Sequence, residues 1–363
     1  MVSTMPEGPY SLAWPADLFE WEAKRVINSQ RSDNVPLLLT EAFVDADIER
    51  DYLVDIGIIG GGAVRHRPMQ WLQDLLQYPD LTRPYQGQVY WAQRHGLAAQ
   101  ASASGFDLAS QFGALLTELQ GRGYFPTALP RECVDDRVSW EAVSARARAA
   151  THVDVSLPLT VPALNTMDLD TIYTLIEYFH DEAQRPRRIE RMHDYANCGA
   201  HYGAYNRESG SVVYRWRINQ ILDAVNAPVR MSAAPQERGR LVRVSRTPLD
   251  DLAEAELEGR GHDPADEVAH AIQTYRARDA GLPQKRAALA LLAGVLESRR
   301  GELKTVLKDD ERDLFNIANN FAIRHRNANQ RTEYGEDFLD WIFWGYLSTA
   351  ALLSALDVRP GSE

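Results

Sequence analysis

The chain has 363 residues, of which 45% are hydrophobic and 25% charged, so it is long enough for two or three domains with a buried core. Its formal net charge of −12 excludes a protein that is basic over its whole surface, such as a chromatin protein. Only two cysteines are present, Cys133 and Cys198, which argues against a disulfide scaffold and fits a reducing compartment. We therefore expect a cytoplasmic globular protein.

Neither end of the chain predicts a membrane segment. Residues 1–15 lack a positively charged segment followed by an apolar run, so we expect no secretory signal. The longest uncharged apolar run, residues 341–356, is short for a membrane span and is flanked by Asp340 and Asp357. We interpret this run as a buried helix and expect no membrane partner.

Apolar spacing along the chain predicts mostly helices. In the first half, helices are expected over residues 15–30, 68–76, 106–120, 140–150 and 168–179, with a strand over 86–93. A strand and turn region after residue 185 leads to a helix over 211–225 and a β-hairpin formed by 229–232 and 240–245. From residue 247 on, the helices are expected over 248–259, 264–278, 283–299, 309–326 and 336–356.

These elements predict a mainly α protein with minor β structure. We divide it into an N-terminal α+β region (1–150), a basic middle region with a β-hairpin (151–246) and a C-terminal antiparallel helical bundle (247–357). Short connections between consecutive helices favour the antiparallel arrangement.

A glycine run, Gly60 to Gly62, follows the apolar segment VDIGII and resembles the strand-to-helix turn of a dinucleotide site. That fingerprint needs a third glycine where this chain has Arg65, and no second strand ending in an acidic residue follows. A flexible turn is the alternative interpretation, and no cofactor is predicted.

Three side chains that can bind metal lie close together in HDYANCGAHY, namely His193, Cys198 and His201. A zinc site needs about four ligands, normally in two separated pairs, and His180 is the only further candidate nearby. The neighbouring tyrosines and glycines equally fit a packed turn. On this balance we predict a structural turn and no metal.

The middle of the chain is basic. Residues 185–246 hold 12 arginines and 5 acidic residues, a net charge of +7 within an acidic chain. Arginines alternate with aromatic residues in YRWR, a pattern suited to phosphate contact and base stacking. The residues predicted to contact nucleic acid are Arg187, Arg188, Arg215, Trp216 and Arg217. The alternative is a surface that pairs with carboxylates of the same chain.

The helix expected over residues 309–326 carries an apolar face that includes His325. Beside this face, Asn316, Asn320, Arg324 and Asn327 form a polar stripe. Buried polar groups need partners, so the stripe either fixes the register of neighbouring helices or lines a cleft. In the second case Arg324 would hold a phosphate, His325 would transfer a proton and Asn320 would orient it.

Parts of the chain also resemble known protein families. The segments FNIANNFAIRHRNANQRTEYGEDFLDWIFWGYL and HDYANCGAHYGAYNRESG resemble a widespread, largely uncharacterised bacterial family over roughly residues 110–356. The helical C-terminus more loosely resembles the HEPN superfamily, whose members include metal-independent ribonucleases of toxin and anti-phage systems. Their implied site is an arginine followed after four to six residues by a histidine, paired across a homodimer.

This sequence departs from the HEPN motif, because Arg324 and His325 are adjacent and residues 329–331 contain no histidine. Adjacent residues on a helix point about 100° apart. From the resemblance of the helical C-terminus we expect a cytoplasmic HEPN-like defence or stress protein that binds RNA or a nucleotide. The missing motif leaves RNA cleavage open, and homodimer formation is also left open. The alternative is a non-enzymatic assembly or partner-binding protein.

Overall fold

The structure is a computed structural model that describes residues 6, 8–45, 47–60, 64, 66–85, 107–134, 137–193, 195, 198–244, 249–260, 263, 265–320 and 335–358, with the backbone alone for 317–320 and 358. It is mainly α with minor β structure, which confirms the predicted fold class. The chain divides into two compact units, residues 1–221 and residues 222–363. The basic middle region, 151–246, contributes to both units.

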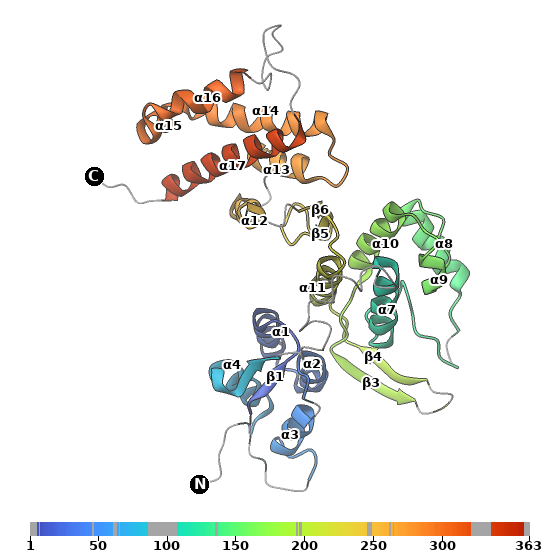
Figure 1. Cartoon of the computed structure of the whole chain (residues 1–363). Helices are drawn as coiled ribbons and strands as arrows, with labels where there is room; N and C mark the ends of the chain where they lie inside the picture. The colour runs from blue at the N-terminus through green and yellow to red at the C-terminus, as the bar shows by residue number, and fades with distance from the viewer. Residues whose placement is uncertain are drawn as a thin grey trace, which may run out of the picture. The chain divides into compact units, whose positions relative to one another are not determined.

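The first unit begins with short helices and a parallel strand pair (Figure 1). Their bounds are β1 (Tyr10–Leu12), α1 (Ala16–Ser29), α2 (Val35–Ala42), α3 (Asp47–Asp55), α4 (Pro68–Gln77) and β2 (Thr82–Pro84), with single 3-10 turns at Ser32–Asn34 and Pro79–Leu81. The core of this part includes Tyr52 and Trp71, whose rings meet edge to face with centroids 5.3 Å apart.

The rest of the first unit consists of helices and one antiparallel hairpin, followed by a long helix that reaches the boundary of the unit. Their bounds are α7 (Leu108–Gly121), α8 (Trp140–Thr151), α9 (Val161–Leu164), α10 (Leu169–Glu182), β3 (Arg188–His193), β4 (Gly199–Gly203) and α11 (Arg207–Ala224). Side chains of Asp107, Ser139 and Asp168 accept hydrogen bonds from backbone N–H groups in the first turns of α7, α8 and α10. These caps satisfy donors that a helix start leaves unpaired.

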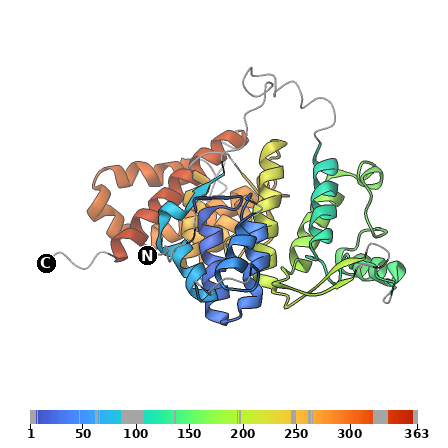
Figure 2. The same ribbon diagram turned by 90° about the horizontal axis from the view of Figure 1, so that it is seen from below.

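The second unit is a helical bundle preceded by a small hairpin. Its elements are β5 (Val229–Met231), β6 (Leu241–Arg243), α12 (Leu249–Arg260), α13 (Glu267–Arg276), α14 (Leu282–Ser298), α15 (Arg300–Leu307), α16 (Asp310–Asn320) and α17 (Glu336–Val358). Both views place α17 alongside α14 (Figure 1 and Figure 2). The rings of Tyr275 and Phe343 stack in the core with centroids 3.8 Å apart.

Helix α17 contains the apolar run noted in the sequence, and one of its faces is buried in the bundle through residues that include Leu339, Phe343 and Leu347. By length and composition it is the one helix in the described part of the chain that could also cross a membrane. The predicted absence of a membrane partner stays a prediction.

Candidate metal centre

Four side chains that can bind metal converge in the first unit: Cys133, His193, Cys198 and His201. His193 ends β3, His201 lies within β4, and Cys198 lies in the connection between these two strands. Cys133 comes from the segment that follows α7, 60 residues before His193. One potential ligand atom from each residue lies within 4.8 Å of all the others.

Three of the distances between these atoms match those of a tetrahedral zinc site. The Cys133 Sγ lies 3.5 Å from His193 Nδ1 and 3.7 Å from His201 Nε2, and the Cys198 Sγ lies 3.3 Å from His201 Nε2. With Zn–S bonds of about 2.3 Å and Zn–N bonds of about 2.05 Å, tetrahedral angles place neighbouring ligand atoms about 3.3–3.8 Å apart. These three separations therefore fit one zinc ion, and the four ligand atoms all lie within 4.8 Å of one another.

The hairpin register brings the two histidines to one side of the β-ribbon. His193 pairs with Gly199 and Arg191 pairs with His201, so His193 and His201 are diagonal neighbours on one face of the ribbon, two residues apart along the ladder. Gly199 has φ of +73°, a conformation that glycine adopts without steric cost. Cys198 directly precedes Gly199, and its Sγ lies 3.3 Å from His201 Nε2.

Arg131 attaches the Cys133 segment to the hairpin. Its guanidinium donates to the backbone carbonyls of Ala200, at 2.8 Å, and Cys198, at 2.9 Å. It also lies over the ring of Tyr202, 5.6 Å from the ring centroid. Arg131 is thereby anchored on the hairpin. Cys133 follows it by two residues and is therefore held close to the strand that carries His201.

The cluster borders a pocket with a volume of about 180 Å³, and all four ligand residues are half-buried. Cys133, Cys198 and His201 line the pocket together with Glu132 and Tyr205. The Glu132 carboxylate accepts a hydrogen bond of 2.6 Å from the Trp140 indole. Because Cys133 and Cys198 line the pocket, their sulfur atoms are reachable from solvent on one side of the cluster.

Electrostatics in the cluster depend on whether a cation lies between the sulfurs. The pKa of the Cys198 thiol is raised by its hydrogen bond with the Cys133 thiol and by burial, while Arg131 and Arg191 act in the opposite direction. Two thiols in contact disfavour a second negative charge. A divalent cation reverses this effect, because coordination deprotonates a thiol.

The structure describes the residues predicted to carry RNase-like chemistry only in part. Arg324 and His325 lie outside the described residues. Asn320 is the last residue of α16, and only its backbone is described. Asn316, on the same predicted polar stripe, is exposed.

The predicted nucleic-acid contacts lie in the first unit, and three of the five arginine and tryptophan side chains hold carboxylates of the same unit. Arg187 binds Glu22 at 3.1 Å. Arg188 binds Asp33 and Glu190 at 3.1 Å and 2.9 Å. Arg217 binds both carboxylate oxygens of Glu118, at 2.9 Å and 2.6 Å. Arg215 and Trp216 are half-buried on α11.

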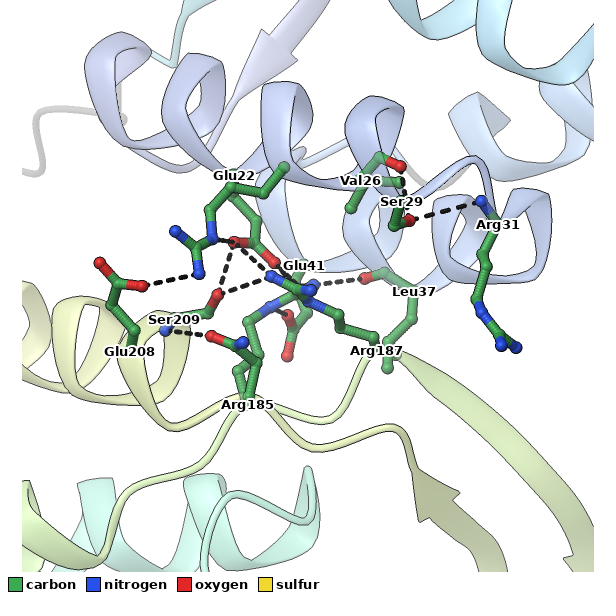
Figure 3. A network of polar contacts seen from close by, with 12 residues as sticks. Glu22, Val26, Ser29, Arg31, Leu37, Glu41, Arg185, Arg187, Glu208 and Ser209 are labelled. Carbon is green, nitrogen blue, oxygen red and sulfur yellow. Dashed lines mark hydrogen bonds and ion pairs between the residues drawn. The ribbon is translucent and has the colours of Figure 1, made fainter.

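The most buried of these ion pairs form a network that includes Arg185, a residue absent from the predicted contacts (Figure 3). Its guanidinium contacts Glu22 at 3.0 Å and Glu41 at 2.5 Å, and all three side chains are at most 3% exposed. Ser209, at the start of α11, donates to Glu22 at 2.6 Å. This network joins α1 and α2 to the segment before β3 and to α11.

The glycine run at Gly60 has a different context from a dinucleotide site. The residues before it, 47–55, form helix α3 rather than a strand, and Gly57 and Gly60 adopt positive φ angles in the turn that follows. Gly61 and Gly62 lie outside the described residues. The strand that the dinucleotide fingerprint requires is therefore replaced by a helix.

The fourth ligand was missed in the sequence because it is not near the other three. The one available signal was that Cys133 is the only cysteine besides Cys198.

A comparison of the chain with protein-family models, with curated proteins and with solved structures finds no match in any of the three.

Proposed function

We propose that this protein binds one zinc ion through Cys133, His193, Cys198 and His201, and that the ion has a structural role. The observation that carries the proposal is the convergence of two thiols and two imidazoles from two separate segments, with all four ligand atoms within 4.8 Å of one another. Four protein ligands complete the coordination of zinc and leave no position for a substrate, which is the pattern of structural sites.

The chemistry of the ligands favours zinc over other common metal ions. Thiolates are soft ligands that magnesium, calcium and manganese avoid, and imidazole suits zinc, copper and iron. A tetrahedral set of two sulfurs and two nitrogens is typical of zinc. No carboxylate belongs to the set among the described residues.

The location of the site explains what a structural ion would contribute. The hairpin β3–β4 has two strands, and Arg188 to His193 are exposed or half-buried along the whole of β3. An isolated two-stranded hairpin is marginally stable in water. An ion held by both strands, the turn and the Cys133 segment would therefore fix the hairpin to the rest of the unit.

Binding of RNA or a nucleotide, a defence role and homodimer formation stay proposals drawn from the sequence. The ion pairs of Arg187, Arg188 and Arg217 support the alternative in which the basic middle pairs with carboxylates of the same chain. A nucleic acid would have to compete with these carboxylates for the same guanidinium groups.

Zinc content tests the proposal directly. Protein purified under reducing conditions without added chelator should contain about one zinc per chain by elemental analysis. Cys133→Ser should weaken zinc binding by more than the roughly 100-fold that loss of an outer-sphere partner costs. His270→Ala, an exposed histidine on α13, is the matched control and should retain the metal.

A second measurement separates loss of metal from loss of fold. Removing zinc from the unaltered chain with a chelator should lower the melting temperature of the first unit, and adding zinc back should restore it. Protein that is folded, reduced and free of zinc, with no thermal response to added zinc, would refute the proposal. Iron in place of zinc would refute the choice of metal.

A further inference from the structure

We infer that the metal centre is also a redox site: a hydroperoxide converts the Cys133 and Cys198 thiolates into a disulfide and thereby releases the zinc ion. This inference rests on the proposed zinc binding and extends it from structure to regulation. It uses the only two cysteines of the chain, both of which are in the thiol form in the structure.

The two sulfur atoms are close enough to react with each other. Each lies within hydrogen-bond range of the same His201 Nε2, at 3.7 Å and 3.3 Å, and the two are within 4.8 Å of one another. Around a tetrahedral zinc ion two sulfurs would lie about 3.8 Å apart. A disulfide bond is about 2.05 Å long, so the sulfurs must approach by less than about 2 Å.

Access for the oxidant is provided by the pocket beside the cluster. Both cysteines line it, whereas a structural zinc site enclosed by protein would shield its sulfurs. Coordination keeps each sulfur in the thiolate form, which is the form that reacts with hydroperoxides. The geometry therefore combines reactive thiolates, an open approach and a nearby second thiolate.

The reaction balances with the hydroperoxide as the only oxidant. One zinc-bound thiolate attacks the outer peroxide oxygen, the O–O bond breaks, and a sulfenic acid forms while the leaving alkoxide takes a proton from water. The second thiolate attacks the sulfenic sulfur, forms the S–S bond and expels hydroxide, which is protonated to water. Two electrons pass from two sulfurs to the O–O bond, and zinc leaves as the unchanged divalent ion.

Loss of zinc follows from what remains of the ligand set. After oxidation only the imidazoles of His193 and His201 can bind the ion, and two ligands do not complete a zinc site. The disulfide joins the same segments that the ion joined, the Cys133 segment and the hairpin turn. Oxidation therefore exchanges one cross-link for another and frees the two histidines.

The test uses the full chain loaded with zinc and treated with hydrogen peroxide. Released zinc is measured with a colorimetric chelator, remaining thiols with a thiol reagent under denaturing conditions, and the chain by intact mass. We expect about two thiols lost per zinc released, a monomer lighter by about 2 Da, and full reversal by a dithiol with zinc taken up again.

The matched variant is Cys133→His, which replaces a thiolate by an imidazole, keeps four metal-binding side chains and cannot form the disulfide. It should bind zinc and retain it at peroxide concentrations that empty the unaltered protein. If the unaltered protein keeps its zinc, loses thiols only to sulfinic acid, or forms only disulfides between chains, the inference is wrong while zinc binding stands. A reduced chain that binds no zinc overturns both.

Discussion

Replacing Arg185 with methionine tests whether the buried ion-pair network stabilises the first unit. Arg185 and Glu22 side chains are fully buried, and that of Glu41 is 3% exposed. Without the guanidinium, Glu22 retains Arg187 and Ser209, at 3.1 Å and 2.6 Å. The Glu41 carboxylate would be left as a buried charge whose remaining partner in the described chain is the Tyr124 hydroxyl, at 3.4 Å.

The expected cost follows from this geometry. Removing one partner of a buried ion pair destabilises a protein by about 3–5 kcal/mol, because an uncompensated charge stays buried. Arg185→Met should therefore lower the free energy of unfolding of the first unit by about this amount. Combining it with Glu41→Gln should recover part of the loss, because the unpaired charge is then removed.

Arg188→Met is the matched control. Arg188 lies three residues away and also binds two carboxylates, Asp33 and Glu190, but its side chain is 31% exposed and its partners are about half exposed. Exposed pairs contribute about 0–1 kcal/mol. Urea unfolding followed by circular dichroism measures both variants, with the transition of the first unit fitted separately. A loss for Arg185→Met below about 1 kcal/mol, or no larger than for Arg188→Met, would refute the reasoning.

Three further predictions concern two helical glycines and the pH dependence of one ion pair. Gly210→Ala, on α11, should destabilise the first unit by about 1–3 kcal/mol, because a Cβ there would lie 2.5 Å from the Arg185 backbone nitrogen. Gly294→Ala, on α14 with no atom within 4 Å of the new Cβ, should instead stabilise the second unit by about 0.5–1 kcal/mol in the same unfolding assay. Hydrogen bonds from Arg217 lower the pKa of the Glu118 carboxyl, against the opposing effect of its burial. The pair therefore stabilises the fold at pH values above the ordinary glutamate pKa. This contribution is lost as the pH falls through the lowered pKa. Arg217→Met should therefore cost up to about 1 kcal/mol near pH 7 and progressively less as the pH falls through the lowered pKa of Glu118, and a cost that does not change with pH would contradict this.

Long amphipathic helices could be located from the sequence, because their spacing repeats over several turns. The patterns over 168–179, 283–299 and 336–356 correspond to α10, α14 and α17, with bounds that differ by a few residues. The hairpin formed by β5 and β6 was also predicted correctly. In these segments local pattern and final structure agree.

Short elements were missed where the pattern is too brief to show a period. Apolar spacing predicts no helix between residues 31 and 67, the segment that contains α2 and α3. Helix α2 has eight residues and is buried against its neighbours, so its sequence VPLLLTEA shows apolar character without a clear polar face. The pairing of β1 with β2 joins residues about 70 apart and depends on tertiary contacts.

From the sequence, pairing of the middle arginines with carboxylates of the same chain could be proposed as an alternative, but the carboxylates could not be identified. Arg185 and Arg187 reach Glu22 across more than 160 residues, and Arg217 reaches Glu118 across 99. A sequence shows that a region is basic, but it does not show which distant carboxylates the fold brings to it. The charge count therefore fitted a nucleic-acid surface and an internal network equally well.

The metal centre also depends on contacts between distant segments, which the sequence does not show and the fold provides. Within HDYANCGAHY three ligands are visible, and three do not make a structural zinc site. The register of β3 against β4 sets His193 and His201 on one side of the ribbon, and a shift of one residue in either strand would turn one of them away. Arg131 then fixes Cys133 opposite them through two backbone carbonyls of the hairpin. Because the fourth ligand depends on a contact between segments more than 60 residues apart, zinc binding and the stability of the first unit should be coupled: removing zinc should lower the melting temperature of this unit, and unfolding the unit should release the ion.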